Sequence, residues 1–250
     1  MKAILSRFLF PMPLLLLAPH AVAGSADYMH TPVVEQGETE FGVKYGRLRS
    51  TSENRGSAFA LGVGHAFTAW WSSEIYLLYD RSNITGTTFD AFEWENTFQL
   101  TRTGQSGMEV GFLTELERSH ESSEGYELVF GPLFQKDFGA LRGNVNILFS
   151  RQFDTARAHA TAHSIDIGYQ FQARYRLNDS VDIGMQAFGE MGKWNNWSER
   201  DAQSHRVGPA VFGAFTPGQE HRIAYDAAIL FETAGKRGYT TFRAAFSYEF

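Results

Sequence analysis

The 250-residue chain contains no cysteine, only seven prolines and, after residue 17, no long apolar run. Without cysteine it forms no disulfide framework, no thiolate metal site and no lipid anchor of the lipoprotein type. A membrane-spanning α-helix needs about 20 consecutive apolar residues, so the sequence predicts no such helix beyond its N-terminal region. Basic residues are also scarce, because 22 Lys and Arg stand against 28 Asp and Glu. This balance argues against nucleic acid or anionic lipid as a partner.

The N-terminal region has the features of an export signal. Lys2 and Arg7 precede an apolar run at 8–17, and the small residues of Ala21-Val22-Ala23 follow it. This pattern predicts a signal peptide that is cleaved before Gly24. Loss of Lys2 and Arg7 with the signal changes the formal net charge from −6 to −8.

Alternation of apolar and polar residues is the main structural signal in the rest of the chain. Residues 164–177 alternate without exception, with Ile165, Tyr169 and Phe171 among the apolar set. A strand of this length exceeds the usual 5–6 residues of a soluble sheet and fits a tilted membrane-spanning strand of about 9–11 residues. The same template predicts twelve strands, at 38–49, 57–67, 72–82, 89–101, 107–117, 125–136, 140–151, 163–176, 181–193, 204–215, 221–232 and 239–250.

These strands predict an all-β fold, namely a transmembrane antiparallel up-and-down β-barrel of about 12 strands. A periplasmic or secreted β-sandwich is the alternative, because its strands also alternate. Three parts are expected along the chain: a cleavable signal peptide at 1–23, a short periplasmic N-terminal segment at 24–36, and the outer-membrane barrel at 37–250.

The last predicted strand ends in an aromatic residue at the C-terminus. It closes with Phe246-Ser247-Tyr248-Glu249-Phe250, in which Phe246, Tyr248 and Phe250 share one face. With the export signal and the amphipathic strands, this ending resembles the assembly signal of Gram-negative outer-membrane β-barrel proteins. The resemblance implies insertion by the barrel-assembly machinery and contact with outer-membrane lipid. More loosely, the chain resembles the twelve-stranded monomeric channels for small solutes, so a monomer is expected.

The predicted strand registers place charged residues inside the barrel. One wall is expected to carry five carboxylates, Glu93, Glu95, Glu115, Glu117 and Glu127, with Glu93 near Glu115 and Glu117 near Glu127. Arg142, Arg174 and Arg176 form a basic side near the periplasmic strand ends. Such walls could select solutes by charge, or the carboxylates could recruit a hard cation such as calcium. Alternatively, the charges could pair with one another and block the lumen.

Three functions follow as expectations, in order of preference. The first is a passive channel or uptake component for small polar or cationic solutes, since the strongly basic lumen of channels for acidic sugars is missing. The second is a closed barrel with a structural or surface-interaction role. The third is a barrel enzyme (a lipase, acyltransferase or protease), which is not expected, because His163-Ser164 and Ser204-His205 are neighbours that point to opposite faces of a strand. The sequence predicts no catalytic residue, cofactor or metal site.

Overall fold

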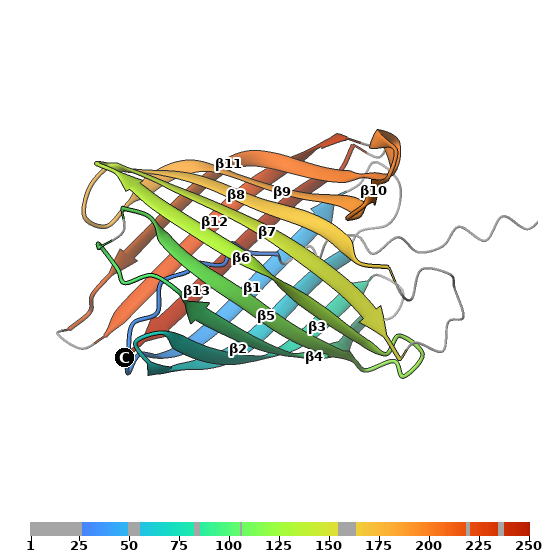
Figure 1. Cartoon of the computed structure of the whole chain (residues 1–250), viewed down its shortest axis with the longest axis horizontal. Coiled ribbons are helices and arrows are strands. Elements are labelled where there is room, and N and C mark those ends of the chain that lie inside the picture. Colours follow the sequence, from blue (N-terminus) through green and yellow to red (C-terminus); the bar gives the residue numbers. More distant parts are fainter. Residues whose placement is uncertain are drawn as a thin grey trace, which may run out of the picture.

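The computed structural model describes residues 27–49, 56–82, 86–105, 107–154, 164–218, 221–234 and 238–250, so the predicted signal peptide lies outside the described residues. Within these ranges twelve long strands form a closed antiparallel barrel (Figure 1). The first six are β1 (Thr39–Arg49), β2 (Gly56–Thr68), β3 (Trp71–Ser82), β4 (Gly86–Gln99), β5 (Glu109–Ser119) and β6 (Tyr126–Phe138). The others are β7 (Leu141–Phe153), β8 (Asp166–Arg176), β9 (Asp182–Lys193), β11 (Ser204–Phe215), β12 (Arg222–Ala234) and β13 (Thr240–Glu249).

The predicted fold class and all twelve predicted strands are confirmed, with strand ends that differ by at most three residues. Each long strand pairs with the next along the chain, and β1 pairs with β13 to close the barrel. Two short elements, the strand β10 (Asn196–Trp197) and the 3₁₀ turn η1 (Arg200–Ala202), lie between β9 and β11. No helix in the described ranges has the length and apolar character needed to span a membrane.

The outer surface of the barrel is apolar. Outward-facing apolar side chains are exposed in the middle of ten of the twelve long strands, namely Val43, Leu61, Ile75, Leu77, Phe92, Val145, Ile147, Phe171, Ile183, Val211, Ile229 and Phe242. An apolar surface of this extent is unfavourable in water and suits the hydrocarbon core of a bilayer. Closure of the barrel pairs the backbone groups of both edge strands, which lipid requires.

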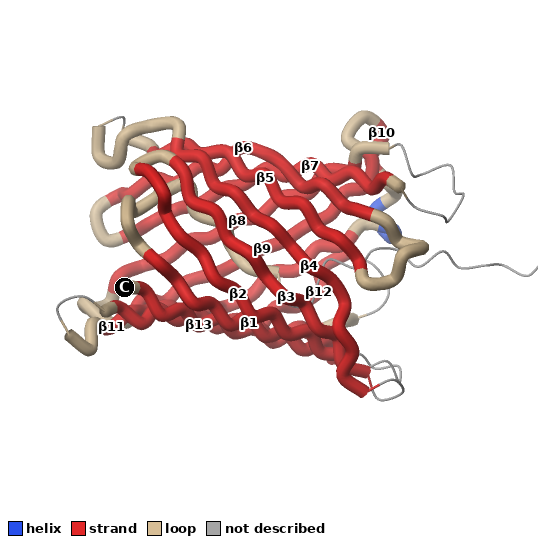
Figure 2. The backbone as a smooth tube through the Cα atoms, turned by 90° about the horizontal axis from the view of Figure 1, so that it is seen from below, coloured by secondary structure: helices blue, strands red, loops and turns tan. Residues whose placement is uncertain are grey.

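Loops join the strands at both ends of the barrel (Figure 2). One end, here called the C-terminal mouth, holds Phe250, the turns 139–140 and 177–181 and the longer connection 100–108. At the opposite end, here called the loop mouth, connections such as 120–125 and 194–203 join the strands. Exposed aromatic rings mark both ends, with Phe67, Trp70, Phe138, Phe215 and Phe250 at the C-terminal mouth and Phe153, Trp194 and Trp197 at the loop mouth. Such girdles are typical of the interfaces of a membrane barrel.

The C-terminal residue takes part in barrel closure. The backbone N–H of Thr39 donates to the carbonyl oxygen of Phe250 at 2.9 Å, and the N–H of Phe250 donates to the carbonyl oxygen of Thr39 at 3.0 Å. The rings of Phe41 and Phe250 stack with centroids 5.9 Å apart. Phe246, Tyr248 and Phe250 all remain exposed on the outer face. Their role as an assembly signal stays a prediction.

Candidate functional site

Residues 27–36, here called the lumenal segment, lie inside the barrel. Arg206 Nη2 on β11 donates to Asp27 Oδ2 at 2.7 Å. Asn146 Nδ2 on β7 donates to the carbonyl oxygen of His30 at 2.9 Å, and the N–H of Val34 donates to Gln99 Oε1 on β4 at 2.8 Å. Because these partners come from separated parts of the closed sheet, the segment crosses the lumen, as its blue trace in Figure 1 also indicates.

The lumen wall is shaped around this segment. Gly111 on β5 faces Pro32, and a Cβ atom added at Gly111 would lie 2.8 Å from Pro32 Cβ. Leu113 and Leu133, which also point inward, are fully buried. The sequence predicts a short periplasmic segment at 24–36 without a place in the lumen, whereas residues 27–36 lie inside the barrel. The signal that could have suggested it is Gly111, since a glycine within a strand often marks close approach of another backbone.

The five predicted carboxylates lie on neighbouring strands in two cross-strand rows. Glu95 on β4 stands opposite Glu74 on β3 and opposite Glu115 on β5. Glu117 on β5 stands opposite Glu93 on β4 and Glu127 on β6, the latter pairing as predicted. Like charges directly opposite each other on a sheet destabilise it, so this wall requires cations or protons.

The predicted proximity of Glu93 and Glu115 agrees with the register, in which the two residues are diagonal neighbours. Glu93 stands directly opposite Glu117, and Glu115 stands directly opposite Glu95. Glu74, which is not among the five predicted carboxylates, belongs to the same wall. Its alternation with Ile75 and Leu77, which point outward, was the available signal.

The lumenal segment supplies partners to this acidic wall. Tyr28 donates its hydroxyl hydrogen bond to Glu95 Oε2, and His30 Nδ1 lies 3.2 Å from Glu95 Oε1. Lys44 Nζ on β1 lies between two aromatic rings, 2.9 Å from the centroid of Tyr28 and 3.3 Å from that of Tyr76. The segment and the wall therefore form one charged and aromatic cluster in the middle of the lumen.

A row of amide side chains lines the neighbouring wall, across β6, β7, β8 and β9. Asn144 Nδ2 donates to Gln135 Oε1 at 3.0 Å, Gln172 Nε2 donates to Asn144 Oδ1 at 3.4 Å, and Gln186 Nε2 donates to Gln172 Oε1 at 2.7 Å. All four side chains are buried. Each amide keeps further donor and acceptor capacity, so this wall can hydrogen-bond water or an uncharged polar solute.

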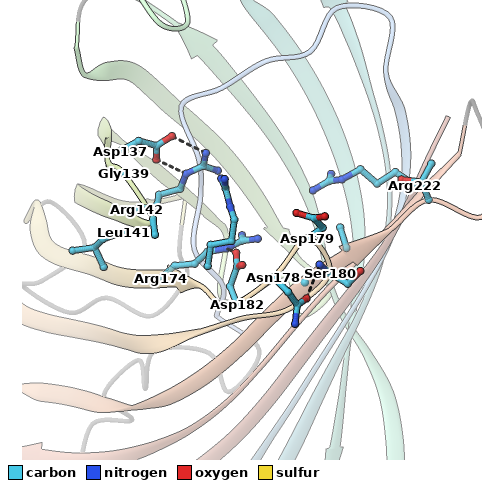
Figure 3. Close-up of a pocket in the computed structure, with 15 residues that line it drawn as sticks. Asp137, Gly139, Leu141, Arg142, Arg174, Asn178, Asp179, Ser180, Asp182 and Arg222 are labelled. Atoms are coloured by element: carbon cyan, nitrogen blue, oxygen red, sulfur yellow. Dashed lines mark hydrogen bonds and ion pairs between the residues drawn. The ribbon is translucent and has the colours of Figure 1, made fainter.

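The three predicted arginines lie at the C-terminal mouth. Arg142, Arg174 and Arg176 line a polar cavity of about 340 Å³ together with Arg222 (Figure 3). Arg142 binds Asp137 through two hydrogen bonds, Nε to Oδ1 at 2.7 Å and Nη2 to Oδ2 at 2.9 Å, and Arg174 pairs with Asp182. Two of the three predicted arginines are therefore neutralised by neighbouring carboxylates.

Two buried arginines that are not among the three predicted ones lie deeper in the lumen. Arg206 binds the lumenal segment through Asp27, and Arg243 on β13 binds Asp226 on β12. Arg243 also stacks over the ring of Phe188, at 5.5 Å from its centroid. The surrounding apolar cluster points inward from β9, β11 and β12 and comprises Phe188, Ala210, Phe212, Ala228 and Leu230. The lumen thus has an acidic, an amide and an apolar sector.

No protein family and no curated protein sequence matches the chain. Solved structures do match. The COG4313 outer membrane channel from Pseudomonas putida F1 aligns with a TM-score of 0.64 at 12% identity, covering 89% of this chain and 98% of that chain. The NanC porin aligns with a TM-score of 0.56 at 13% identity, covering 83% of this chain and 98% of that chain.

These likenesses show a shared fold. At such low identity they assign neither solute nor residue roles to this chain. The lumen described above has to be interpreted from its own side chains.

A pH-sensitive carboxyl lies at the C-terminal mouth, immediately before β1. Burial raises the pKa of Glu38 from 4.5 to about 7, with further contributions from the charges of Glu249 and Glu35 and an opposing one from Arg222. The folded protein therefore keeps a proton that the unfolded chain loses, and its stability falls as the pH rises from about 4.5 to about 7.

Replacing Glu38 by glutamine removes this titration. We expect E38Q and the wild type to unfold at the same temperature at pH 4, and E38Q to unfold at a higher temperature at pH 8. Thermal unfolding of the detergent-solubilised protein, followed by circular dichroism across this range, measures the difference. Glu121 in an exposed loop is the control, and equal pH dependence of the wild type and E38Q would contradict the assignment.

Proposed function

We propose that the chain is a narrow channel of the Gram-negative outer membrane for small polar or cationic solutes, closed by its lumenal segment in the described conformation. The observation that carries the proposal is the acidic wall, in which Glu74, Glu95 and Glu115 stand side by side across three strands inside a closed barrel. The apolar outer surface and the aromatic girdles support the membrane location. The names of the two compared structures, a channel and a porin, agree with it.

The acidic wall suits cations. Carboxylates in a narrow passage with low-dielectric walls raise the local concentration of cations and repel anions. The amide row on the adjacent wall offers hydrogen bonds that can replace part of a solute's hydration shell. Acidic oligosaccharides are a poor match for such a lumen.

Opening requires the lumenal segment to move. The segment is held by separate hydrogen bonds to several strands, of about 0.5–1.5 kcal/mol net each, and by the ion pair between Asp27 and Arg206, for which about 1.5–3 kcal/mol is typical. It is not a strand of the barrel, so its displacement leaves the sheet intact.

Outer-membrane lipid is the proposed environment of the apolar surface. The barrel-assembly machinery is the proposed partner during insertion, which it would recognise through Phe246, Tyr248 and Phe250.

A closed barrel with a structural or surface-interaction role is the second candidate. The observation that favours it is the same segment, because Tyr28, His30, Pro32 and Val34 occupy the lumen. Neither candidate function includes catalysis, so we expect the folded protein to leave lipid and peptide substrates unchanged.

Single-channel recording in planar bilayers tests the channel and its acidic wall. The refolded mature protein is expected to give discrete, cation-preferring steps, and the reversal potential in a salt gradient measures this preference. A triple variant, E93Q/E95Q/E115Q, is expected to lose most of it because the wall loses three charges. A double variant in exposed loops, E121Q/E199Q, is the control and keeps the wild-type reversal potential.

Two results would count against this proposal in different ways. A folded protein without any current would favour the closed barrel. A conducting triple variant with unchanged selectivity would show that other groups select the solute.

A further inference from the structure

Three side chains in the lumen present metal-ligand atoms to one another. His30 comes from the lumenal segment, Glu95 from β4 and Glu115 from β5. One ligand atom of each, a histidine ring nitrogen and two carboxylate oxygens, lies within 4.8 Å of the other two. His30 and Glu95 are buried, and Glu115 is partly buried.

A third carboxylate lies beside this cluster. Glu93 is 8% exposed. The charges that act on it most strongly are those of Lys44, Glu95 and His30, so it belongs to the same cluster. Several carboxylates buried close to one another are costly unless cations compensate them, and the cluster therefore favours an additional cation.

Lys44 does not compensate these carboxylates by direct contact. Its ammonium group lies between the rings of Tyr28 and Tyr76, and within the described part of the chain Nζ has no hydrogen-bond partner. With Glu74 and Glu117 included, five carboxylates share this region with Lys44 and His30. One lysine leaves most of that negative charge uncompensated.

We propose that His30, Glu95 and Glu115 bind a divalent transition-metal ion, with Zn²⁺ as its probe. One imidazole nitrogen with two carboxylate oxygens is a donor set that Zn²⁺ accepts, whereas Ca²⁺ takes six to eight oxygens. The hydroxyl group of Tyr28, which donates to Glu95 Oε2, orients one ligand from outside the coordination sphere. Glu93 supplies further negative charge beside the ion.

A bound ion would also connect the lumenal segment to the barrel wall. His30 belongs to the lumenal segment, whereas both glutamates belong to the barrel wall, so a bound ion ties the segment to the wall. Metal binding itself does not depend on the proposed channel. The expectation that the ion keeps the lumen closed rests on that proposal.

Calorimetric titration of ZnCl₂ into the refolded, chelator-treated mature protein in detergent tests the site. We expect saturable binding of one ion per chain. The variants H30Q and E115Q are each expected to bind roughly tenfold or more weakly. H65Q, a histidine outside the cluster, and E121Q, a carboxylate in an exposed loop, are controls with wild-type affinity.

Heat-modifiable migration in gel electrophoresis establishes that each variant is folded before titration. Absence of saturable binding to the folded wild type, wild-type affinity in both ligand variants, or a preference for Ca²⁺ over Zn²⁺ would each overturn the site. A protein that binds zinc but never conducts would retain the site and refute the channel, so the two proposals can fail separately.

Discussion

A mature chain that lacks residues 27–36 is expected to carry sustained current where the complete chain opens rarely and briefly. The deleted segment crosses the lumen and holds partners on β4, β7 and β11. After deletion, Gln99, Asn146 and Arg206 face water, which can replace the lost hydrogen bonds at small cost. The strands remain paired, because the segment contributes none of the inter-strand hydrogen bonds of the barrel. Single-channel conductance and open probability in planar bilayers measure the effect.

Gly111→Ala provides a milder version of the same change. Its new Cβ atom would lie 2.8 Å from Pro32 Cβ and 2.9 Å from Pro32 Cα, so the segment has to shift away from β5. Gly42→Ala is the matched inward-facing control, because its Cβ atom would meet its nearest neighbours at 3.5 Å, an ordinary contact. We expect a higher open probability for G111A and an unchanged one for G42A.

The lumenal segment would not be the closing element if the deletion variant folds and stays electrically silent. Folding is monitored by heat-modifiable migration and circular dichroism. Equal open probability of G111A and the wild type would argue against the close fit at Pro32.

The strands of this protein could be predicted because their signal is local. Side chains of a membrane strand point alternately to lipid and to the lumen, so the sequence of each strand shows a period of two whatever its partner strands are. The run at 164–177 shows this most clearly, although β8 itself begins only at Asp166. The inward orientation of Glu93, Glu95, Glu115, Glu117 and Glu127 follows from the same alternation.

Features that depend on contacts between different strands were harder to predict from the sequence. The register between β4 and β5 depends on the connection between them, so the sequence did not distinguish the residue directly opposite Glu93, which is Glu117, from its diagonal neighbour Glu115. The lumenal segment has no periodicity, so its place depends on contacts with distant strands, such as Asn146 and Arg206. Arg243 was visible as an inward residue of the last strand, but its pairing with Asp226 requires the register of β12 and β13.

Replacing Arg243 by methionine is expected to destabilise the barrel strongly. The Arg243 side chain is 2% exposed, and its partner Asp226 is 25% exposed. The variant leaves the carboxylate of Asp226 without its cation beside apolar side chains, and loss of one member of a buried ion pair costs about 3 kcal/mol. Unfolding by guanidinium chloride, followed by tryptophan fluorescence, measures the free energy of unfolding.

Two further variants decide whether this loss comes from the unpaired carboxylate. Arg142→Met removes an arginine whose side chain is 37% exposed and whose partner Asp137 is 49% exposed, and such exposed pairs contribute about 0–1 kcal/mol. The double variant R243M/D226L removes both charges, and replacement of a buried pair by apolar residues is often neutral. We therefore expect R142M and the double variant to remain near wild-type stability. A double variant as unstable as R243M would instead attribute the loss to the packing of Arg243 over Phe188.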